Sequence, residues 1–243
     1  MSEQTFPMRI AAIRPEAEGV ISLLLEQPDG TPLPPVDPGA HVDLHLANGL
    51  NRSYSLSNGP ADAGRYRLTI ARDANSSGGS AFIHDVLKAG DTVAVSAPRN
   101  NFALALDAPA SLFIAGGIGI TPFVPMVAAL NAAGRPWTLH YCVRTRGRAA
   151  LLGELEALAA AGPGRLITNF DEEPGGTMLD LAGVLKAAAP GTHVYCCGPT
   201  GMLDAFRAAA SAAGIDSDHV HFEYFSADVD KATEGGFTVV CQK

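Results

Sequence analysis

The first hundred residues consist of short stretches in which apolar and polar positions alternate, with turn residues between them. In one of them Val42, Leu44 and Leu46 alternate with polar side chains, the period of two that is typical of a half-buried strand. Many short strands without a long helical pattern predict a closed barrel or a sandwich. These stretches are residues 6–15, 19–28, 40–47, 52–58, 65–72 and 91–98. Residues 80–87 instead predict a short helix with Ser80 as its N-cap.

From about residue 108 the pattern changes to apolar strands that alternate with helical stretches. Residues 111–116 are a continuous apolar strand, and residues 121–134 have helical spacing that ends at Gly134. Further strands are expected at residues 136–143, 191–198 and 219–225, and further helices at 149–162 and 201–214. Such alternation predicts a parallel sheet with helices on both faces.

The change of pattern predicts two domains, residues 1–107 and 108–226. Residues 227–243 form a third part, a polar linker that ends in the strand-like sequence FTVVCQK. A single strand cannot form a domain by itself.

Composition narrows the class of protein. With 47% hydrophobic and 17% charged residues, the chain of 243 residues can bury a sizeable core. A net charge of −8 argues against a nucleic-acid partner. We expect a cytoplasmic protein without membrane contact, because there is no signal-peptide pattern and no apolar stretch of the roughly 20 residues that span a bilayer. The cysteines lack the C-x2-C spacing of zinc sites, no histidine pair has metal-ligand spacing, and we expect no metal site.

Two glycine turns follow apolar strands. The turn AGGIGITPF contains Gly117 and Gly119, and Pro122 stands where the usual dinucleotide fingerprint has a third glycine. Glycines let the backbone approach a pyrophosphate, and a helix N-terminus offers free N–H groups to it. The turn therefore indicates a dinucleotide site or, alternatively, only a tight structural turn.

The second turn, VYCCGPTGML, contains Cys197, Gly198 and Pro199. Ligands of open parallel sheets bind at the carboxyl ends of strands, so both turns can face one ligand. Alternatively, Cys197 is a buried cysteine that packs as a small apolar residue.

The choice of nucleotide is less clear from the residues alone. NAD-binding folds often have an acidic residue about 20 positions after the first turn, but residues 108–153 contain none. Arg144, Arg146 and Arg148 follow the second strand instead. Arginines there favour the 2′-phosphate of NADP; the alternative is a solvated basic loop.

The stretch RSYSLSN at residues 52–58 has an arginine and four hydroxyl groups on a predicted strand. The residues alone suggest cross-strand pairs at a sheet edge. This stretch, with SSGGS and FIHD, APRNNF, AGGIGITPF, VYCCGP and HFEYF, resembles the ferredoxin–NADP reductase superfamily over roughly residues 8–226. The branch that it resembles most is that of phthalate dioxygenase reductase and vanillate demethylase reductase. The resemblance implies a six-stranded antiparallel flavin-binding barrel followed by a Rossmann-like parallel-sheet nucleotide-binding domain.

The resemblance also implies roles for the residues of the first motif. Arg52 would pair with the flavin phosphate, because the guanidinium fork suits a phosphate. Tyr54 would pack against the isoalloxazine ring, and Ser55 would form a hydrogen bond near its N5. Phe225 would stack on the ring until the nicotinamide displaces it, and Glu223 would support Ser55.

The flavin that this branch uses at its glycine-rich site is FMN. Gly78, Gly79 and Ser80 would bind its terminal phosphate, with Arg72 adding charge. Members that bind FAD usually add a platform for the adenine, and none is visible near residues 73–80, so we expect FMN rather than FAD. The catalytic residues that we expect are Ser55, Cys197 and Glu223. The other cofactor-binding residues are expected to be Ser53, Ile70, Ala71, Gly117, Gly119, Thr121, Pro122, Arg144, Cys197, Gly198 and Pro199.

The branch mostly uses NADH, so we expect NADH rather than NADPH. The resemblance implies a reductase component that passes electrons from NADH through FMN to an iron–sulfur domain or ferredoxin, and on to a terminal aromatic-ring oxygenase or O-demethylase. The chain lacks the C-x4-C-x2-C spacing of a plant-type [2Fe–2S] domain, so we expect no such cluster in it, and the final FTVVCQK resembles the first strand of that absent domain. The alternatives are an FAD- and NADPH-dependent ferredoxin or flavodoxin reductase, and a nucleotide-sensing subunit without flavin.

Overall fold

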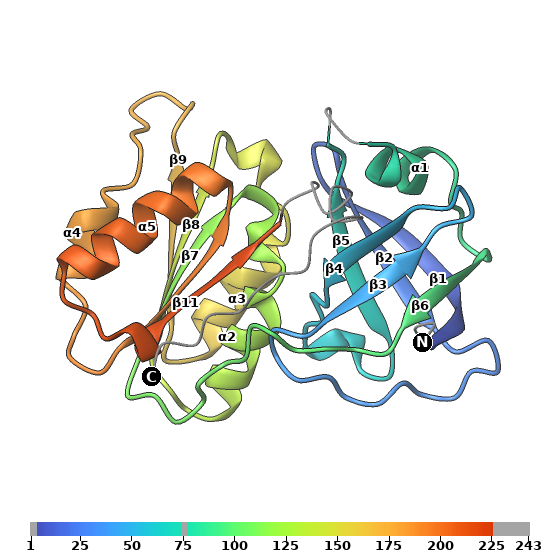
Figure 1. Cartoon of the computed structure of the whole chain (residues 1–243), viewed down its shortest axis with the longest axis horizontal. Helices are drawn as coiled ribbons and strands as arrows, with labels where there is room; N and C mark the ends of the chain where they lie inside the picture. The colour runs from blue at the N-terminus through green and yellow to red at the C-terminus, as the bar shows by residue number, and fades with distance from the viewer. Residues whose placement is uncertain (1–3, 74–76, 226–243) are drawn as a thin grey trace, which may run out of the picture.

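The computed structural model describes residues 4–73 and 77–225. The two parts of the chain form two sheets that lie side by side (Figure 1). We call the part around the first sheet the barrel half and the part around the second sheet the α/β half. The tail predicted at residues 227–243 lies outside the described residues.

The sheet of the barrel half has six antiparallel strands in the order β4-β3-β6-β1-β2-β5. A bridge between Leu56 and Leu68 brings the chain just after β4 against β5, which joins the two ends of the sheet as in a barrel. The elements are β1 (Thr5–Ala17), β2 (Val20–Glu26), β3 (His41–His45), β4 (Asn51–Ser55), η1 (Pro60–Asp62), β5 (Tyr66–Ala71), α1 (Gly79–Asp85) and β6 (Thr92–Ser96).

The sheet of the α/β half has five parallel strands in the order β11-β10-β7-β8-β9. Its first elements are β7 (Ser111–Gly116), η2 (Gly117–Ile120), α2 (Phe123–Ala132), β8 (Trp137–Val143), η3 (Arg146–Arg148), α3 (Leu152–Ala161) and β9 (Arg165–Phe170). They are followed by α4 (Leu181–Lys186), β10 (His193–Gly198), α5 (Thr200–Ala212), η4 (Ser217–His219) and β11 (Val220–Tyr224).

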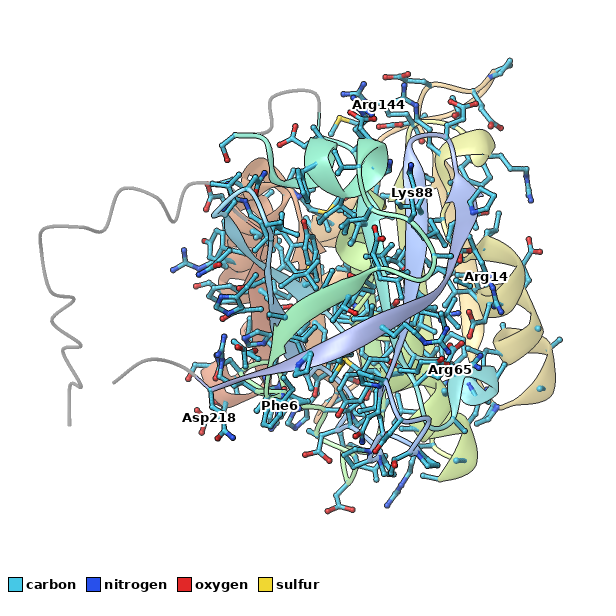
Figure 2. The ribbon with its side chains drawn as sticks, turned by 90° about the vertical axis from the view of Figure 1, so that its right-hand side faces the viewer. Phe6, Arg14, Arg65, Lys88, Arg144 and Asp218 are labelled. Atoms are coloured by element: carbon cyan, nitrogen blue, oxygen red, sulfur yellow. The ribbon has the colours of Figure 1, made fainter. Side chains whose placement is uncertain are left out.

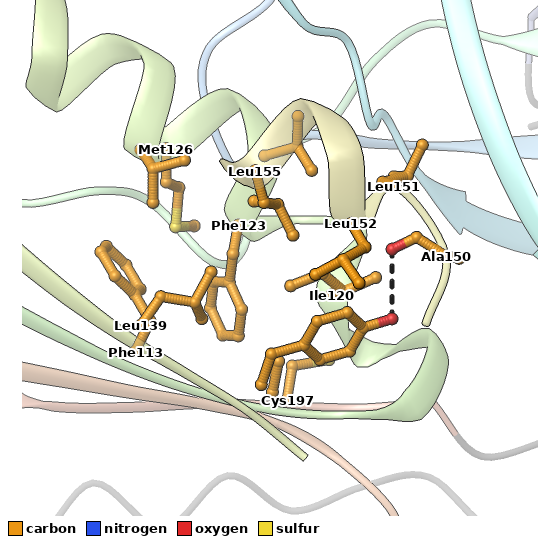
Figure 3. Close-up of a cluster of buried hydrophobic side chains, with 14 of the residues drawn as sticks. Phe113, Ile120, Phe123, Met126, Leu139, Ala150, Leu151, Leu152, Leu155 and Cys197 are labelled. Atoms are coloured by element: carbon orange, nitrogen blue, oxygen red, sulfur yellow. Dashed lines mark hydrogen bonds between the residues drawn. The ribbon is translucent and has the colours of Figure 1, made fainter. Parts of the chain in front are cut away.

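Both faces of the parallel sheet are buried. On β7, Phe113 and Ala115 belong to the cluster formed with α2 and α3, whereas Leu112 and Ile114 belong to the cluster formed with α4 and α5. Figure 3 shows the first cluster around Phe113. A strand buried on both faces has no polar side, which explains why residues 111–116 read as a continuous apolar run.

The cluster around Phe113 also contains residues of the barrel half. Val20 of β2 is buried in it, and Ala17 and Ala71 pack against it. The apolar cluster around Phe113 therefore extends across the contact between the two halves, while the barrel half also has an apolar core of its own.

The expected fold class is confirmed, with corrections in detail. Ser80 is not the N-cap of α1; Gly78 is, with a φ of 106° that favours glycine, and the Ser80 hydroxyl instead accepts a hydrogen bond from the backbone N–H of Asp73 at 3.1 Å. Strand β9 and helix α4 are two further elements that the sequence patterns did not predict. The strand β9 is only half-buried at the sheet edge and lacks an apolar run, and α4 has only six residues. The boundary at residue 107 falls between β6 and β7 and remains a proposal.

In the described ranges 4–73 and 77–225, no helix combines the length and the apolar character needed to cross a membrane. Viewed from the barrel side, charged side chains such as Arg14, Arg65 and Lys88 point outward (Figure 2).

The first prediction concerns the stability that the apolar cluster around Phe113 contributes. Phe113 is fully buried, with ring centroids 5.1 Å from both Phe123 and Tyr195. We expect Phe113→Ala to lower the free energy of unfolding by about 3–5 kcal/mol, the usual loss for a buried phenylalanine. The same truncation at Phe6, which is 41% exposed, should cost less than about 1 kcal/mol. Urea unfolding followed by circular dichroism measures both, and equal losses would contradict the assignment of the core.

Candidate functional site

A cleft with a volume of about 690 Å³ lies between the two halves. Its size falls in the range of roughly 300–1,000 Å³ that is typical of ligand sites. Both halves contribute to it: strands β3, β4 and β5 and helix α1 from one, and η2 and the end of β11 from the other. The lining residues are His41, Asp43, Asn51, Arg52, Ser53, Tyr54, Ser55, Thr69, Ile70, Ala71, Asp73, Ser80, Asn101, Ile118, Thr121, Glu223, Tyr224 and Phe225.

Strand β4 forms one wall of this cleft. Four consecutive residues, Arg52, Ser53, Tyr54 and Ser55, all line it. The strand pairs along one edge with β3, and the chain just after it bridges to β5 through Leu56 and Leu68. The side chains of β4 border the opening between the halves. Burial raises the pKa of Tyr54 to about 12, so its ring presents a neutral phenol to the cleft. The wall thus combines a cation, an aromatic ring and hydroxyl groups.

The start of α1 lies against Arg52. A Cβ atom at Gly79 would lie 2.8 Å from both Cγ and Nε of Arg52, so the arginine stem occupies the space that the glycine leaves open. The guanidinium donates to the backbone carbonyl of Asn51 at 2.7 Å and to the hydroxyl of Ser77. Arg52 is therefore held beside the glycine-rich segment, with the predicted residues Gly78 and Ser80 close in sequence.

Ser55 and Glu223 meet across the two halves. The Ser55 hydroxyl lies 3.5 Å from Oε2 of Glu223, and both residues line the cleft. Burial raises the pKa of Glu223 to about 7, although the hydrogen bond from Ser55 opposes the shift. This carboxyl group can therefore hold or release a proton near neutral pH.

Cys197 lies beside this pair but does not line the cleft. It pairs in register with Glu223 between β10 and β11 and is fully buried. Burial and then the nearby Glu223 raise the pKa of its thiol well above the usual value, so the sulfur is neutral. Packing in the apolar core is what the structure shows for this residue.

The two glycine turns touch each other. A Cβ atom at Gly119 would lie 2.2 Å from the carbonyl oxygen of Cys197, and one at Gly198 would lie 3.1 Å from Cα of Gly116. Gly117 has a φ of 55°. The turn residues that line the cleft are Ile118 and Thr121. Gly117, Gly119, Pro122, Gly198 and Pro199 are not among its lining residues.

The arginines of the predicted basic loop are paired with carboxylates. Arg144 lies 3.4 Å from Glu172, Arg146 lies 3.5 Å from Glu156, and Arg148 lies 3.7 Å from Glu18. All three arginine side chains are more than half exposed. Arg72 likewise pairs with Asp85, with a second contact of 2.9 Å, and is not among the lining residues.

Sequence reasoning missed several lining residues. His41 and Asp43 come from β3, opposite the predicted strand, and Thr69 comes from β5 beside Ile70 and Ala71. Asn51, Asp73, Asn101, Ile118 and Tyr224 were also missed, although each adjoins a quoted motif or a predicted residue. The pairing of Ser53 with Asp43, in register and through a hydrogen bond from its hydroxyl, depends on strand register, which the sequence does not state.

Comparison with known proteins gives a consistent result. A model of the oxidoreductase NAD-binding domain matches residues 113–208. The phenoxybenzoate dioxygenase subunit beta of Ectopseudomonas oleovorans is 48% identical over 96% of this chain and 70% of that protein. The vanillate O-demethylase oxidoreductase of Pseudomonas sp. (strain HR199 / DSM 7063) is 41% identical over 95% of this chain and 72% of that protein.

Among solved structures, phthalate dioxygenase reductase superposes with a TM-score of 0.82 and 35% identity, over 91% of this chain and 68% of that one. That protein is described as a modular structure for electron transfer from pyridine nucleotides to [2Fe–2S]. The fold, the cleft between the halves and these similarities all indicate the same family. The chain belongs to the family of oxygenase and demethylase reductase components, the phthalate dioxygenase reductase and vanillate O-demethylase reductase branch of the ferredoxin–NADP reductase superfamily.

Proposed function

We propose that this chain is the NADH-oxidising, FMN-binding part of an oxygenase reductase, which delivers electrons to an iron–sulfur acceptor that serves an aromatic-ring oxygenase or an O-demethylase in the cytoplasm. The observation that carries the proposal is the single cleft in which Arg52, Tyr54 and Ser55 of the barrel half face Glu223 and Phe225 of the α/β half. The oxygenase and demethylase relatives support the choice of acceptor system.

The residues present fit a flavin phosphate. Gly79 leaves open the space through which the Arg52 stem passes, and a side chain there would displace the guanidinium. Gly78 has the left-handed backbone with which α1 begins. Arg52, Gly78, Gly79 and Ser80 would therefore hold the phosphate, because a guanidinium and backbone N–H groups are its usual donors.

The rest of the wall fits a flat ring with a polar rim. Tyr54 and Phe225 would cover its faces, and Ser53, Ile70 and Ala71 would border it, since all of these residues line the cleft. In the α/β half, the other aromatic side chain among the described lining residues is Tyr224. Near the glycine-rich segment, the described lining residues are Asp73 and Ser80, and neither is aromatic. That supports FMN, which lacks the adenine that such a platform would hold.

A bound flavin supplies the chemistry of the family, because it accepts a hydride from a nicotinamide and releases the electrons one at a time. The protein's own residues would position the flavin and the nicotinamide and would hold a proton beside them. The Ser55 hydroxyl donates toward Glu223 and, because a hydroxyl rotates, can turn to donate to an acceptor atom at the rim of the ring. The Glu223 carboxyl group can take up or release its own proton near neutral pH, since burial raises its pKa to about 7.

The nucleotide would lie over the two glycine turns, with Thr121 at the cleft and Gly117, Gly119, Pro122, Gly198 and Pro199 forming the scaffold. Cys197, being neutral and buried, would shape the nicotinamide pocket without acting as a nucleophile. Arg144 would border the adenosine ribose. Because Glu172 already pairs with Arg144, a 2′-phosphate would meet a carboxylate there, and this supports NADH.

A flavin-binding assay tests the core of the proposal. Arg52→Ala should weaken FMN binding by about 10–100-fold, because a hydrogen bond to a charged group contributes roughly 1.5–3 kcal/mol. Riboflavin, which has no phosphate, should bind the variant and the wild type within threefold. Arg14→Ala, an exposed arginine of β1, is the matched control. A wild-type chain that binds neither FMN nor FAD refutes the proposal, and equal losses for FMN and riboflavin contradict the role of Arg52.

The choice of nucleotide is tested by stopped-flow reduction of the FMN-loaded protein. NADH should reduce the wild type at least tenfold more efficiently than NADPH. Glu172→Gln should raise the efficiency with NADPH by about 3–10-fold, since it removes a carboxylate beside Arg144, and should leave NADH within twofold. Asp107→Asn, an exposed change in the connection between the halves, serves as control. A tenfold preference of the wild type for NADPH would show that the nucleotide assignment is wrong.

The raised pKa of Glu223 predicts a pH dependence of stability. Between its ordinary pKa of 4.5 and about 7, the folded state keeps a proton that the unfolded chain has lost, so stability falls as pH rises through this window. The loss is at most about 3 kcal/mol. Glu223→Gln should remove it, so that the variant gains stability over the wild type at pH 8 but not at pH 4.5. Melting temperatures at both pH values, with Asp107→Asn as control, measure the difference; a parallel shift at both values would contradict the prediction.

A further inference from the structure

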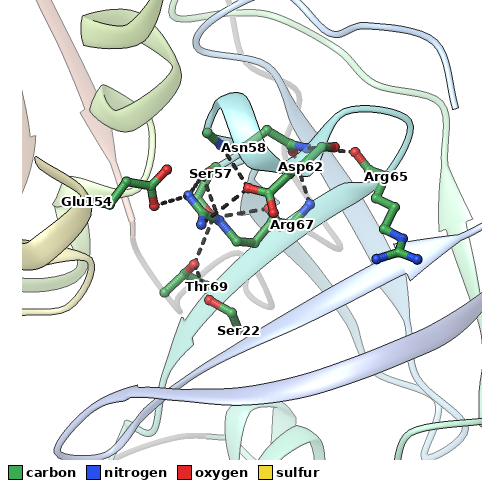
Figure 4. Close-up of polar contacts among 9 residues, drawn as sticks. Ser22, Ser57, Asn58, Asp62, Arg65, Arg67, Thr69 and Glu154 are labelled. Atoms are coloured by element: carbon green, nitrogen blue, oxygen red, sulfur yellow. Dashed lines mark hydrogen bonds and ion pairs between the residues drawn. The ribbon is translucent and has the colours of Figure 1, made fainter. Parts of the chain in front are cut away.

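A buried ion cluster joins the two halves at a distance from the predicted reacting groups (Figure 4). The guanidinium of Arg67, from β5, lies 3.2 Å from Asp62 of η1 and 2.8 Å from Glu154 of α3. The side chains of Arg67 and Asp62 are only 8% and 2% exposed, and that of Glu154 is 25% exposed. The cluster therefore links two nearly buried charges of the barrel half to a partly buried carboxylate of the α/β half.

The geometry of this cluster is tightly defined. Arg67 also donates from Nε to the backbone carbonyl of Ser57 at 2.9 Å, and Asp62 accepts the backbone N–H of Gly59 at 2.9 Å. Buried charges are stable only when their hydrogen-bonding capacity is satisfied, and removing one partner leaves the other exposed to the full desolvation penalty. Each group is thus confined to one position, unlike an exposed pair such as Glu18 with Arg148, whose side chains are 67% and 52% exposed.

Gly59 provides the space in which Glu154 approaches. A Cβ atom at this position would lie 1.6 Å from Oε1 of Glu154. Its φ of −99° is open to any residue, so the backbone conformation does not require a glycine. The requirement is the close approach of α3 to the barrel half.

The cluster is coupled to the cleft through β5. The Ser57 hydroxyl lies 2.7 Å from the hydroxyl of Thr69, which lies 2.7 Å from that of Ser22. Thr69 lines the cleft, and it follows Arg67 by two residues on the same strand. A shift of Arg67 therefore moves the strand that carries the cleft wall.

On the other side of the ion pair, Glu154 belongs to helix α3 of the α/β half. It stands in the first turn of α3, three residues after the N-cap Leu151, which is buried and has a φ of 59°. Leu151 is the one non-glycine residue with a positive φ in the described ranges. A backbone in this sparsely populated region persists only where its surroundings hold it, and the buried Leu151 side chain packs in the apolar cluster around Phe113.

We propose that Arg67 and Glu154 are positioning residues for hydride transfer, which set the distance between the two halves and thereby between nicotinamide and flavin. The proposal rests on the proposed function. In that reaction two electrons and one proton leave the dihydronicotinamide of NADH together as a hydride, which oxidises NADH to NAD⁺ and reduces the flavin. The reacting atoms must approach to about 3–3.5 Å, and a misplacement of about 1 Å costs on the order of a hundredfold in rate.

The test compares Glu154→Gln and Glu154→Leu in the FMN-loaded full chain. Glutamine keeps the length and an acceptor for Arg67, whereas leucine keeps neither. The rate constant for flavin reduction at saturating NADH should fall about 3–10-fold in Glu154→Gln and at least 30-fold in Glu154→Leu. The dissociation constant for NADH, the flavin content and reduction by dithionite should stay within threefold of the wild type. Glu18→Gln, which removes the exposed pair with Arg148, should leave the rate within twofold.

The outcomes separate this proposal from the function on which it rests. If the wild type binds flavin but NADH does not reduce it, the proposed function fails. If NADH reduces the wild type and both Glu154 variants at the same rate, only the positioning role fails. A loss of rate that follows a loss of flavin in proportion also overturns the positioning role, because it assigns the pair to folding alone. If Glu154→Leu does not fold, the split between rate and affinity in Glu154→Gln decides.

Discussion

The apolar core that the two halves share is the contact on which the rest of the structure depends. Val20 of the barrel half is buried in the same cluster as Phe113 and Tyr141 of the α/β half. Apolar burial holds surfaces together but has no preferred direction. Direction comes from the polar contacts around the core, such as the backbone bond from Glu18 to Gly147 at 3.0 Å and the ion pair of Arg67 with Glu154. The two kinds of contact together define how the cleft opens.

The electrostatics of the cleft follow from this joint. Glu223 stands at the end of an edge strand, where a carboxylate would ordinarily be hydrated, and it is burial at the joint that raises its pKa to about 7. Cys197, by contrast, is buried in the apolar cluster around Phe113, and that burial keeps its thiol neutral. Glu223 lines the cleft together with Ser55 of the barrel half. The proposed site is therefore a property of the assembled halves, and perturbing the joint at a distance should change chemistry without touching a reacting group.

From the sequence, we predicted those parts of the fold and of the cleft that depend on residues close together in the chain. Strand alternation predicted a barrel or a sandwich, and the family resemblance of the RSYSLSN motif singled out Arg52 to Ser55 as a contiguous set. Strand β9 escaped because an edge strand has no apolar run, and Asp43 escaped because its place opposite Ser53 depends on register. Arg67 and Glu154 lie far apart in the chain, and their meeting is decided by packing. No sequence pattern in either segment predicts this ion pair.

The glycine turns show why a motif can have two correct explanations. Gly119 and Gly198 are needed for packing, since a Cβ atom at either would press on the neighbouring turn. A tight structural turn is thus a sufficient reason for both. Gly117 differs, because a Cβ atom there would meet nothing within 4 Å, and only its φ of 55° favours glycine. In the proposed function, the open space at Gly117 is where the nucleotide would approach the backbone, while Gly119 and Gly198 keep the two turns close together. The structural explanation accounts for how the turns meet, and the nucleotide explanation accounts for the space that they leave.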